Sequence, residues 1–279
     1  GVSSIFITDR SAQIPYGFKW ADFDAQTTKL SVQSGTTGNI TLENDKSLPH
    51  DSIVLYINKK YDVSPHLKVP FLKYLLPEND WWKAESHENL EIPIGKSGSD
   101  IHSITISTED TNGALLIGTT GSGKSNLLHV IIANAICKYS PDKLELYLVD
   151  LKGGVEFPPY ADKYIPHIRA IAIDSEREFG LSVLEKLEKE MLDRQAKWNQ
   201  LQVNDLAFYH NWYPKEIMPR ILLIVDEFQK FFAEDDEIKS KVDYILNDIL
   251  NQGRAFGINI LFASQTLSGN NTLNKTIKE

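Results

Sequence analysis

The segment from Gly118 to Ser125 carries residue types at a spacing that can bind the phosphates of a nucleotide. It reads Gly-Thr-Thr-Gly-Ser-Gly-Lys-Ser, which fits the pattern G-x-x-x-x-G-K-S. Because glycine has no Cβ, the backbone N–H groups of such a loop can turn toward a single anion. Lys124 would supply a cation for the β- and γ-phosphates, and the Ser125 hydroxyl would be a ligand for Mg²⁺.

The residues that flank this loop favour a nucleotide site over the alternative, a Gly- and Ser-rich turn that precedes a helix by chance. An apolar run, Ala114–Ile117, comes before the loop, and an apolar pattern over 127–132 follows it. The N-terminus of the following helix would add backbone amides and the positive end of its dipole. We therefore predict that the loop binds ATP with Mg²⁺, through Gly118, Thr119, Thr120, Gly121, Ser122, Gly123, Lys124, Ser125 and Asn126.

Two adjacent acidic residues, Asp226 and Glu227, end a second apolar run that begins at Ile221. At the carboxyl end of a strand beside the phosphate loop, Asp226 would hold Mg²⁺ through water. Glu227 would then activate the attacking water as general base. The alternative is a strand that ends in two solvated carboxylates, but after a phosphate loop the pair is typical of an ATP-hydrolysing site.

Three further polar residues are candidates for the same chemistry. Gln265 follows the apolar run 258–264 and could sense the γ-phosphate or orient the water, although amides at strand ends are also common as caps. Arg254 precedes that run and could act as an arginine finger on a neighbouring subunit's nucleotide, the alternative being a surface arginine paired with a carboxylate. Lys152 precedes two glycines, and its contact could be the nucleotide, a neighbouring subunit or a translocated polymer.

Apolar runs that alternate with helical patterns predict an α/β domain with a mostly parallel sheet that is buried on both faces. The expected strands are 101–107, 144–150, 168–173, 221–227 and 258–265, with a helix over 126–138. A second, long helix is expected up to about Trp198, opened by a capping box of Ser175 and Glu178.

The first part of the chain, residues 1–88, has a different texture. Short β-prone runs are separated by Gly, Pro, Asn and Asp, and they cover Ser4–Thr8, Leu30–Val32, Gly38–Leu42 and Ser52–Ile57. We predict a β-rich module or partial domain over 1–88, followed by the nucleotide domain over 89–279. The basic segment Lys59–Tyr61 is more simply a solvated hairpin end than a partner contact.

The 279 residues carry a net charge of −9 and a single cysteine, Cys137. The acidity counts against a broad nucleic-acid footprint, and one cysteine excludes a disulfide within the chain, so that Cys137 is expected in the core. No paired histidine spacing suggests zinc, and no apolar run approaches the roughly 20 residues that span a bilayer. We expect a cytoplasmic protein, or the cytoplasmic part of a larger one whose membrane anchor, if any, lies outside this chain, since the sequence starts without Met.

The ordered set of motifs resembles the FtsK/SpoIIIE family of ring motor ATPases. The resemblance covers about residues 80–270, starting with Trp82 and Ile92–Gly95. It then rests on Ile117–Ser125, Val149–Gly154, Pro166–His167, Ile224–Phe228, Gly253–Arg254, Gly257–Ile258 and Ala263–Gln265. It implies a RecA-like fold, a homo-oligomeric ring, usually a hexamer, with ATP bound between subunits, and a polymer that moves through a central pore.

The resemblance as a whole implies a DNA translocase, and DNA is the partner we expect. A second branch of the family, the EssC/EccC proteins of type VII secretion, moves proteins, and the segment Asp150–Gly154 looks closer to that branch. Two departures from the family pattern count against double-stranded DNA as the substrate: Thr266–Leu267 replaces the usual Arg-Pro, and the chain stops before the family's last sheet strand and any DNA-reading domain. A third class, a nucleotide-binding regulator that does not hydrolyse ATP, would not need an intact general base at Glu227.

Overall fold

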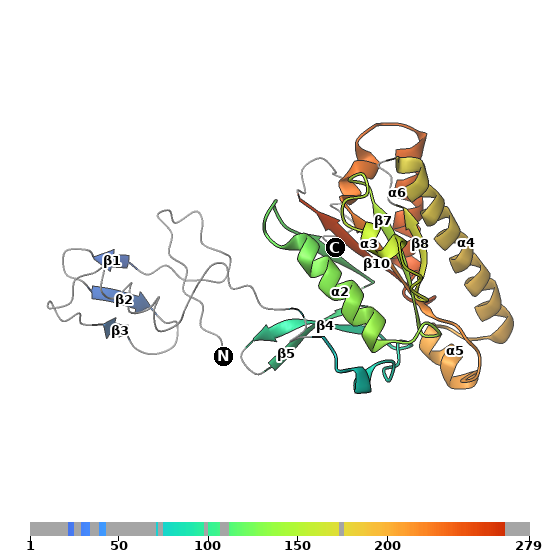
Figure 1. The fold of residues 1–279 in the computed structure, drawn as a ribbon, viewed down its shortest axis with the longest axis horizontal. Coiled ribbons are helices and arrows are strands. Elements are labelled where there is room, and N and C mark those ends of the chain that lie inside the picture. The colour runs from blue at the N-terminus through green and yellow to red at the C-terminus, as the bar shows by residue number, and fades with distance from the viewer. Residues whose placement is uncertain are drawn as a thin grey trace. The chain divides into compact units, whose positions relative to one another are not determined.

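The structure is a computed structural model that describes residues 71, 75–97, 100–106, 112–172 and 176–265, with 96 and 97 as backbone only. It also describes the backbone of three short strands at 22–24, 29–33 and 39–42. The chain forms two compact units, residues 1–69 and 70–279 (Figure 1). Each unit is described by itself.

The described part of the first unit is an antiparallel sheet with the strand order β1-β2-β3. The strands are β1 (Asp22–Asp24), β2 (Lys29–Gln33) and β3 (Asn39–Leu42). Strands β2 and β3 confirm two of the predicted β-prone runs, whereas β1 has two aspartates among its three residues and carries no such signal. The predictions for Ser4–Thr8, Ser52–Ile57 and Lys59–Tyr61 lie outside the described residues.

The second unit is built on a five-stranded sheet with the order β6-β10-β9-β7-β8. Every neighbouring pair is parallel, which confirms the predicted α/β class. The three inner strands are nearly continuous apolar runs because both faces of the sheet are covered. In chain order the strands are β6 (Gly113–Ile117), β7 (Leu144–Asp150), β8 (Ile168–Ala172), β9 (Arg220–Asp226) and β10 (Ile258–Ser264).

Alternation along β9 divides its side chains between two cores. Leu222 and Ile224 face a core formed with α2 (Lys124–Lys138) and with the hairpin of β4 (Leu90–Ser97) and β5 (Asp100–Ile106). Ile221, Leu223 and Val225 face the other core, under α4 and α6 (Figure 1). The elements on that second side are α4 (Arg177–Leu201), α5 (Leu206–Trp212), the 3₁₀ turn η4 (Phe228–Phe232) and α6 (Glu237–Gln252).

The described part of the second unit also contains two short elements, η3 (Glu78–Asp80) and α3 (Pro158–Ala161). Cys137 is buried in α2, as predicted for a core residue. Within the described ranges no helix is both long and apolar enough to cross a membrane.

The predicted capping box at the start of the long helix α4 falls partly on residues that the structure does not describe. Its N-cap is Glu176, which makes no side-chain capping bond, and Ser175 lies outside the described residues. Arg177, the first helical residue, instead makes a two-pronged ion pair with Asp236 at 2.6 and 2.9 Å. Asp236 is itself the N-cap of α6, where it accepts the Lys239 amide hydrogen. The start of α4 is thus tied to the start of α6.

The segment that precedes β4 belongs to the second unit, upstream of the boundary that we expected near residue 89. The Trp82 indole donates to the Ile136 carbonyl at 3.0 Å, and the Ser86 hydroxyl donates to the Lys143 carbonyl at 2.5 Å. Arg220 is 2% exposed and donates to the carbonyls of Ser86 (2.5 Å) and His87 (2.8 Å). These bonds to α2 and to the base of the sheet make the segment part of the nucleotide domain.

Replacement of Arg220 by Leu should destabilise the nucleotide domain by about 2–5 kcal/mol, since buried acceptors lose a charged donor. The third of these acceptors is the side-chain oxygen of Asn259, at 2.9 Å. Burial lowers the pKa of Arg220 to about 10, so the guanidinium is still charged at neutral pH. Urea unfolding monitored by circular dichroism measures the change.

Arg169→Leu is the matched control, because Arg169 makes an exposed ion pair with Glu145 at 2.8 Å. Exposed pairs contribute about 0–1 kcal/mol, and the control should stay within that range. Equal unfolding midpoints for the two variants would contradict a structural role for the Arg220 bonds.

Candidate functional site

The predicted phosphate loop connects β6 to α2, as the strand–loop–helix pattern requires. Gly121 and Gly123 adopt φ values of 81° and 93°, in the left-handed region that glycine favours. Gly123 is the N-cap of α2, and no side chain there accepts the amides of the first turn. The helix N-terminus is therefore open toward a cleft of about 350 Å³. It is lined by Thr119, Thr120, Gly121, Gly123, Lys124, Ser125, Asn126, Lys152, Glu156 and Gln265.

Two of the predicted loop residues do not line this cleft. The Gly118 amide continues the sheet by donating to the Ser264 carbonyl at 3.1 Å, and the Ser122 amide donates to the Thr119 carbonyl at 3.0 Å. Gly118 and Ser122 therefore shape the backbone of the phosphate loop and do not line the cleft. Lys152, whose role the sequence left open, is exposed and lies in the lining of the nucleotide cleft.

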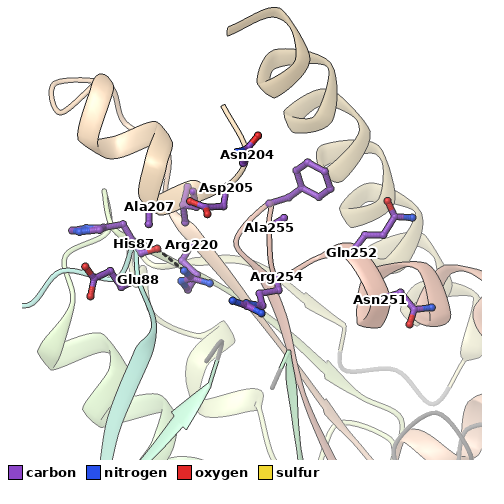
Figure 2. A pocket seen from close by; sticks show the side chains of 12 residues that line it. His87, Glu88, Asn204, Asp205, Ala207, Arg220, Asn251, Gln252, Arg254 and Ala255 are labelled. Atoms are coloured by element: carbon purple, nitrogen blue, oxygen red, sulfur yellow. Dashed lines mark hydrogen bonds between the residues drawn. The ribbon is translucent and has the colours of Figure 1, made fainter. Parts of the chain in front are cut away.

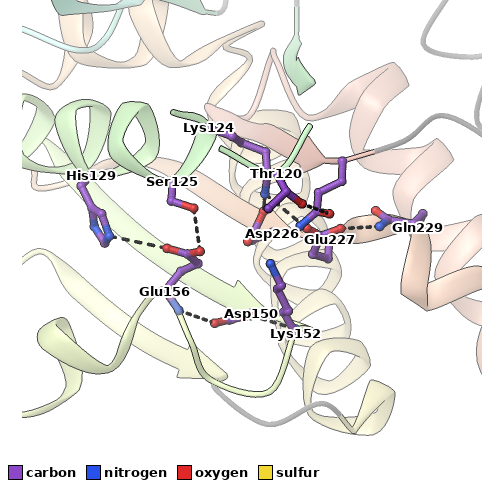
Figure 3. A network of polar contacts seen from close by, with 11 residues as sticks. Thr120, Lys124, Ser125, His129, Asp150, Lys152, Glu156, Asp226, Glu227 and Gln229 are labelled. Atoms are coloured by element: carbon purple, nitrogen blue, oxygen red, sulfur yellow. Dashed lines mark hydrogen bonds and ion pairs between the residues drawn. The ribbon is translucent and has the colours of Figure 1, made fainter. Parts of the chain in front are cut away.

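Lys124 and the two predicted acidic residues form one buried cluster (Figure 3). The Lys124 ammonium makes a close ion pair with Asp226 Oδ1 and lies 3.5 Å from Glu227 Oε1. Asp226 is fully buried, and this burial raises its pKa, while the hydrogen bond and the charge of Lys124 act in the opposite direction. The cluster thus places a phosphate-binding cation directly against the two candidate carboxylates.

Glu227 has a strained backbone, with φ at 54°. A left-handed residue other than glycine costs about 1–3 kcal/mol, and such strain gathers at functional sites. Burial raises the pKa of Glu227, but a hydrogen bond from Gln229 and the charges of Lys124 and Lys152 outweigh burial, and the net pKa is lowered. Glu227 is therefore a carboxylate at neutral pH, in the form that can accept a proton.

Glu156, which contacts the phosphate loop through Ser125, is a residue that the sequence analysis did not single out. The Ser125 hydroxyl donates to Glu156 Oε1 at 2.6 Å, and the Glu156 amide donates to Asp150 Oδ2 at 2.8 Å. Asp150 also accepts the Lys152 amide hydrogen at 2.8 Å. The sequence did contain a signal for this role of Glu156. In the run Asp150–Glu156, an aspartate ends a buried strand and is followed by a glycine-containing loop that leads to Glu156.

Gln265 lies where the sequence predicted it, at the carboxyl end of β10. The Thr120 hydroxyl donates to Gln265 Oε1 at 3.2 Å, which joins the last residue of this edge to the phosphate loop. Asp226 and Glu227 lie at the end of β9, Gln265 follows the end of β10, and Ser125 lies at the start of α2. They meet at one edge because parallel strands end together.

The donor set fits Mg²⁺. No group of three or more His, Cys, Asp or Glu side chains that could cage a metal occurs in the described ranges. Mg²⁺ does not need one, since it keeps several waters and is bound through one or two protein ligands and substrate phosphates. Asp226 Oδ2 is buried without a hydrogen-bond partner among the described residues, and Ser125 provides a nearby hydroxyl. These two oxygen donors suit a hard cation that arrives with a nucleotide.

Arg254 lies at the opposite edge of the sheet, where β10 begins. The seven residues of β10 span about 20 Å, so the Arg254 side chain does not reach the phosphate loop of its own chain. It lies beside Arg220 in a second cleft, of about 540 Å³ (Figure 2). The structure therefore does not bring Arg254 together with the other candidates within one copy.

The loop that carries Arg254 is held rigidly. Gly253 packs so closely that a Cβ there would lie 2.5 Å from the Ile249 carbonyl oxygen. Two side chains of α4 donate to the loop backbone: Arg194 to the Phe256 carbonyl at 2.7 Å, and the Trp198 indole to the Ala255 carbonyl at 3.2 Å. Arg254 itself is exposed on this fixed support, a placement that suits contact with another molecule.

The chain is similar to known proteins in both sequence and fold. Residues 72–269 match the family model described as the FtsK/SpoIIIE family. The chain belongs to the FtsK/SpoIIIE family. The ESX secretion system protein YukB of Bacillus subtilis is 31% identical over 200 residues, which are 68% of this chain and 13% of YukB.

The ESX-5 secretion system protein EccC5 of Mycobacterium tuberculosis is 32% identical over 163 residues, 55% of this chain and 11% of EccC5. This FtsK/SpoIIIE-family chain thus spans only 11% to 13% of the length of these two relatives.

Two solved structures share the fold. The cytoplasmic domain of the type VII secretion ATPase EccC of Thermomonospora curvata has a TM-score of 0.55 at 24% identity, over 77% of this chain and 25% of that one. The pCW3 conjugation coupling protein TcpA, in a monomer form with ATPγS, has a TM-score of 0.60 at 19% identity, over 93% and 74%. These likenesses confirm the predicted P-loop ATPase fold of this FtsK/SpoIIIE-family chain.

Lys124→Met should destabilise the nucleotide-free domain, because it leaves Asp226 buried without its cation. The folded-state pKa of Asp226 is already raised and should rise further in the variant. Below the unfolded-state pKa the group is neutral in both states and costs nothing. Above it the unfolded chain gains a charge that the folded chain resists, so the penalty should grow with pH. We expect about 3–5 kcal/mol at pH 8 and clearly less at pH 5.5.

Urea titrations at the two pH values measure this difference, with Lys152→Met as the control. Lys152 is an exposed lysine of the same cleft and should change stability little at either pH. A penalty for Lys124→Met that is the same at both pH values would show that Asp226 does not titrate as inferred.

Proposed function

We propose that this chain is the ATP-hydrolysing module of a motor assembled from several copies, in which each ATP lies between two subunits. One observation carries the proposal. Lys124, Asp226 and Glu227 form a buried cluster at the phosphate loop, while Arg254 is presented on a rigid loop at the opposite edge of the sheet. A ring of at least two copies, or of six as the family resemblance implies, would place the Arg254 of one subunit at the nucleotide of the next.

In the proposed hydrolysis of ATP, different residues of this chain bind the phosphates, hold the metal ion and activate water. ATP draws Lys124 away from the acidic pair, and the loop amides and Lys124 hold its phosphates. Ser125 and Asp226 would hold Mg²⁺, which when bound neutralises charge on the phosphate oxygens. Glu227 takes a proton from the attacking water, and Gln265 holds that water or the γ-phosphate in place. Arg254 of the neighbouring copy stabilises charge in the transition state.

For the moved polymer we propose a polypeptide. Support comes from the relatives, since YukB and EccC5 are named as secretion proteins, and from the net charge of −9, which disfavours a broad contact with DNA. DNA translocation, which the family resemblance first suggested, is the competing proposal. In either case the module would work in the cytoplasm, where ATP is available.

Glu227→Gln should bind ATP normally and reduce turnover at least about 100-fold, because the amide cannot accept the proton. ATP hydrolysis is measured at several protein concentrations, with binding measured in parallel by a fluorescent ATP analogue. Near-normal turnover in this variant would remove Glu227 from the base role.

The wild-type assay, repeated with double-stranded DNA, also separates the two polymers. A rate that climbs with both protein concentration and DNA would favour DNA translocation. A rate that is indifferent to DNA, at concentrations where rings form by light scattering, would support the polypeptide proposal.

Arg254→Ala should retain ATP binding and lose turnover by about 10³-fold or more, as expected for an arginine finger. The decisive test mixes this variant with Glu227→Gln, which keeps Arg254 but cannot hydrolyse in its own site. Recovery of activity over a range of mixing ratios would show that Arg254 acts on the neighbouring subunit. The absence of recovery at every ratio would contradict the interfacial site.

A further inference from the structure

We propose that Glu156 is a positioning residue for the Mg²⁺ ligand Ser125. This inference rests on the proposed ATPase function and deepens it. The Ser125 hydroxyl donates to Glu156 Oε1 at 2.6 Å, and His129 Nε2 lies 3.8 Å from Glu156 Oε2 (Figure 3). Ser125 and His129 are one turn apart on the same face of α2, so the two carboxylate oxygens face two successive positions of that helix.

The position of Glu156 is fixed from both sides along the chain. Its amide donates to Asp150 Oδ2 at 2.8 Å, and Asp150 is fully buried at the end of β7. The next residue, Phe157, is also fully buried. The side chain of Glu156 is only 12% exposed. A carboxylate held in this way keeps one orientation toward Ser125 and does not swing freely into solvent.

The chemistry of a serine ligand requires an acceptor of this kind. A hydroxyl that binds Mg²⁺ uses an oxygen lone pair and keeps its proton, which must then be donated elsewhere. In this structure the Ser125 hydroxyl donates to Glu156, and Asp226, the other proposed Mg²⁺ ligand, accepts from Lys124 through Oδ1. By accepting a hydrogen bond from the Ser125 hydroxyl, Glu156 leaves the lone pairs of that oxygen available to a metal ion in the cleft that Lys124, Ser125 and Glu156 line.

Removal of such an outer partner costs about 10–100-fold in metal affinity in other proteins. We therefore expect Glu156→Ala to need about 10–100 times more Mg²⁺ for half-maximal binding of a fluorescent, non-hydrolysable ATP analogue. In EDTA the variant should bind the analogue at least as well as the wild type does, because a carboxylate in the lining of the cleft cannot hold phosphate oxygens. Glu156→Gln should lose less than Glu156→Ala, since its amide oxygen can still accept from Ser125.

Two further variants make the experiment specific. Glu145→Gln removes the same charge near the start of β7, at the opposite edge of the sheet, and should leave the Mg²⁺ dependence unchanged. In a Ser125→Ala background, Glu156→Ala should add little, because the hydroxyl that it positions is absent. Thermal unfolding of each variant confirms that the comparison is made on folded protein.

Two outcomes would overturn the inference. An unchanged Mg²⁺ dependence in Glu156→Ala would make the bond to Ser125 a feature of the nucleotide-free state only. Tighter binding in the presence of Mg²⁺ would show that Glu156 competes with the metal. If the wild type itself shows no Mg²⁺-dependent binding of ATP, the proposed function fails first, and this is distinguishable from a failure of the role of Glu156 alone.

Discussion

The nucleotide site depends on one constraint, the cost of holding charges inside the edge of a buried parallel sheet. Asp226 is fully buried and Lys124 nearly so, and each alone would destabilise the fold. Their contact offsets much of that cost in the nucleotide-free protein. It also prepares the chemistry, because an incoming triphosphate must compete for a cation that already has a partner. The contact between Lys124 and Asp226 thus stabilises the fold, and an incoming triphosphate that binds Lys124 would leave the carboxylate of Asp226 available to a metal ion.

Parallel strands separate the two halves of the machinery. The carboxyl ends of β6, β9 and β10 carry the phosphate loop, the acidic pair and Gln265, while Arg254 precedes β10 and lies at the amino edge. The carboxyl and amino ends of the strands are separated by the length of the strands, so Arg254 cannot reach the phosphate loop of its own chain. The fixed loop under Arg254, held by Arg194 and Trp198 of α4, is therefore better suited to a neighbouring molecule than to its own site.

Features that depend on residues close together in the sequence were predicted correctly in their position along the chain. The phosphate loop and the pair Asp226–Glu227 follow apolar runs, and both lie where those runs predicted. The contact that fixes the start of α4 was not predicted, because Arg177 pairs with Asp236, a residue remote in sequence whose contact no local pattern reveals. Glu156 and the bonds of Arg220 to residues 86 and 87 were missed for the same reason, since only the folded sheet brings these groups together.

Asp150 and Asp226 show how two identical side chains can serve different purposes. They occupy paired positions at the ends of the adjacent strands β7 and β9. Asp150 accepts two backbone N–H groups and so fixes the loop that carries Lys152 and Glu156. Asp226 has one oxygen on Lys124 and one without a partner in the described region. Burial raises the pKa of Asp226, and the charge on Asp150 raises it further. A cation beside Asp226 therefore stabilises its charged form against both effects. One acid thus organises a loop while the adjacent acid keeps an oxygen without a partner among the described residues, and this difference supports the proposal of a site for Mg²⁺–nucleotide rather than for phosphate alone.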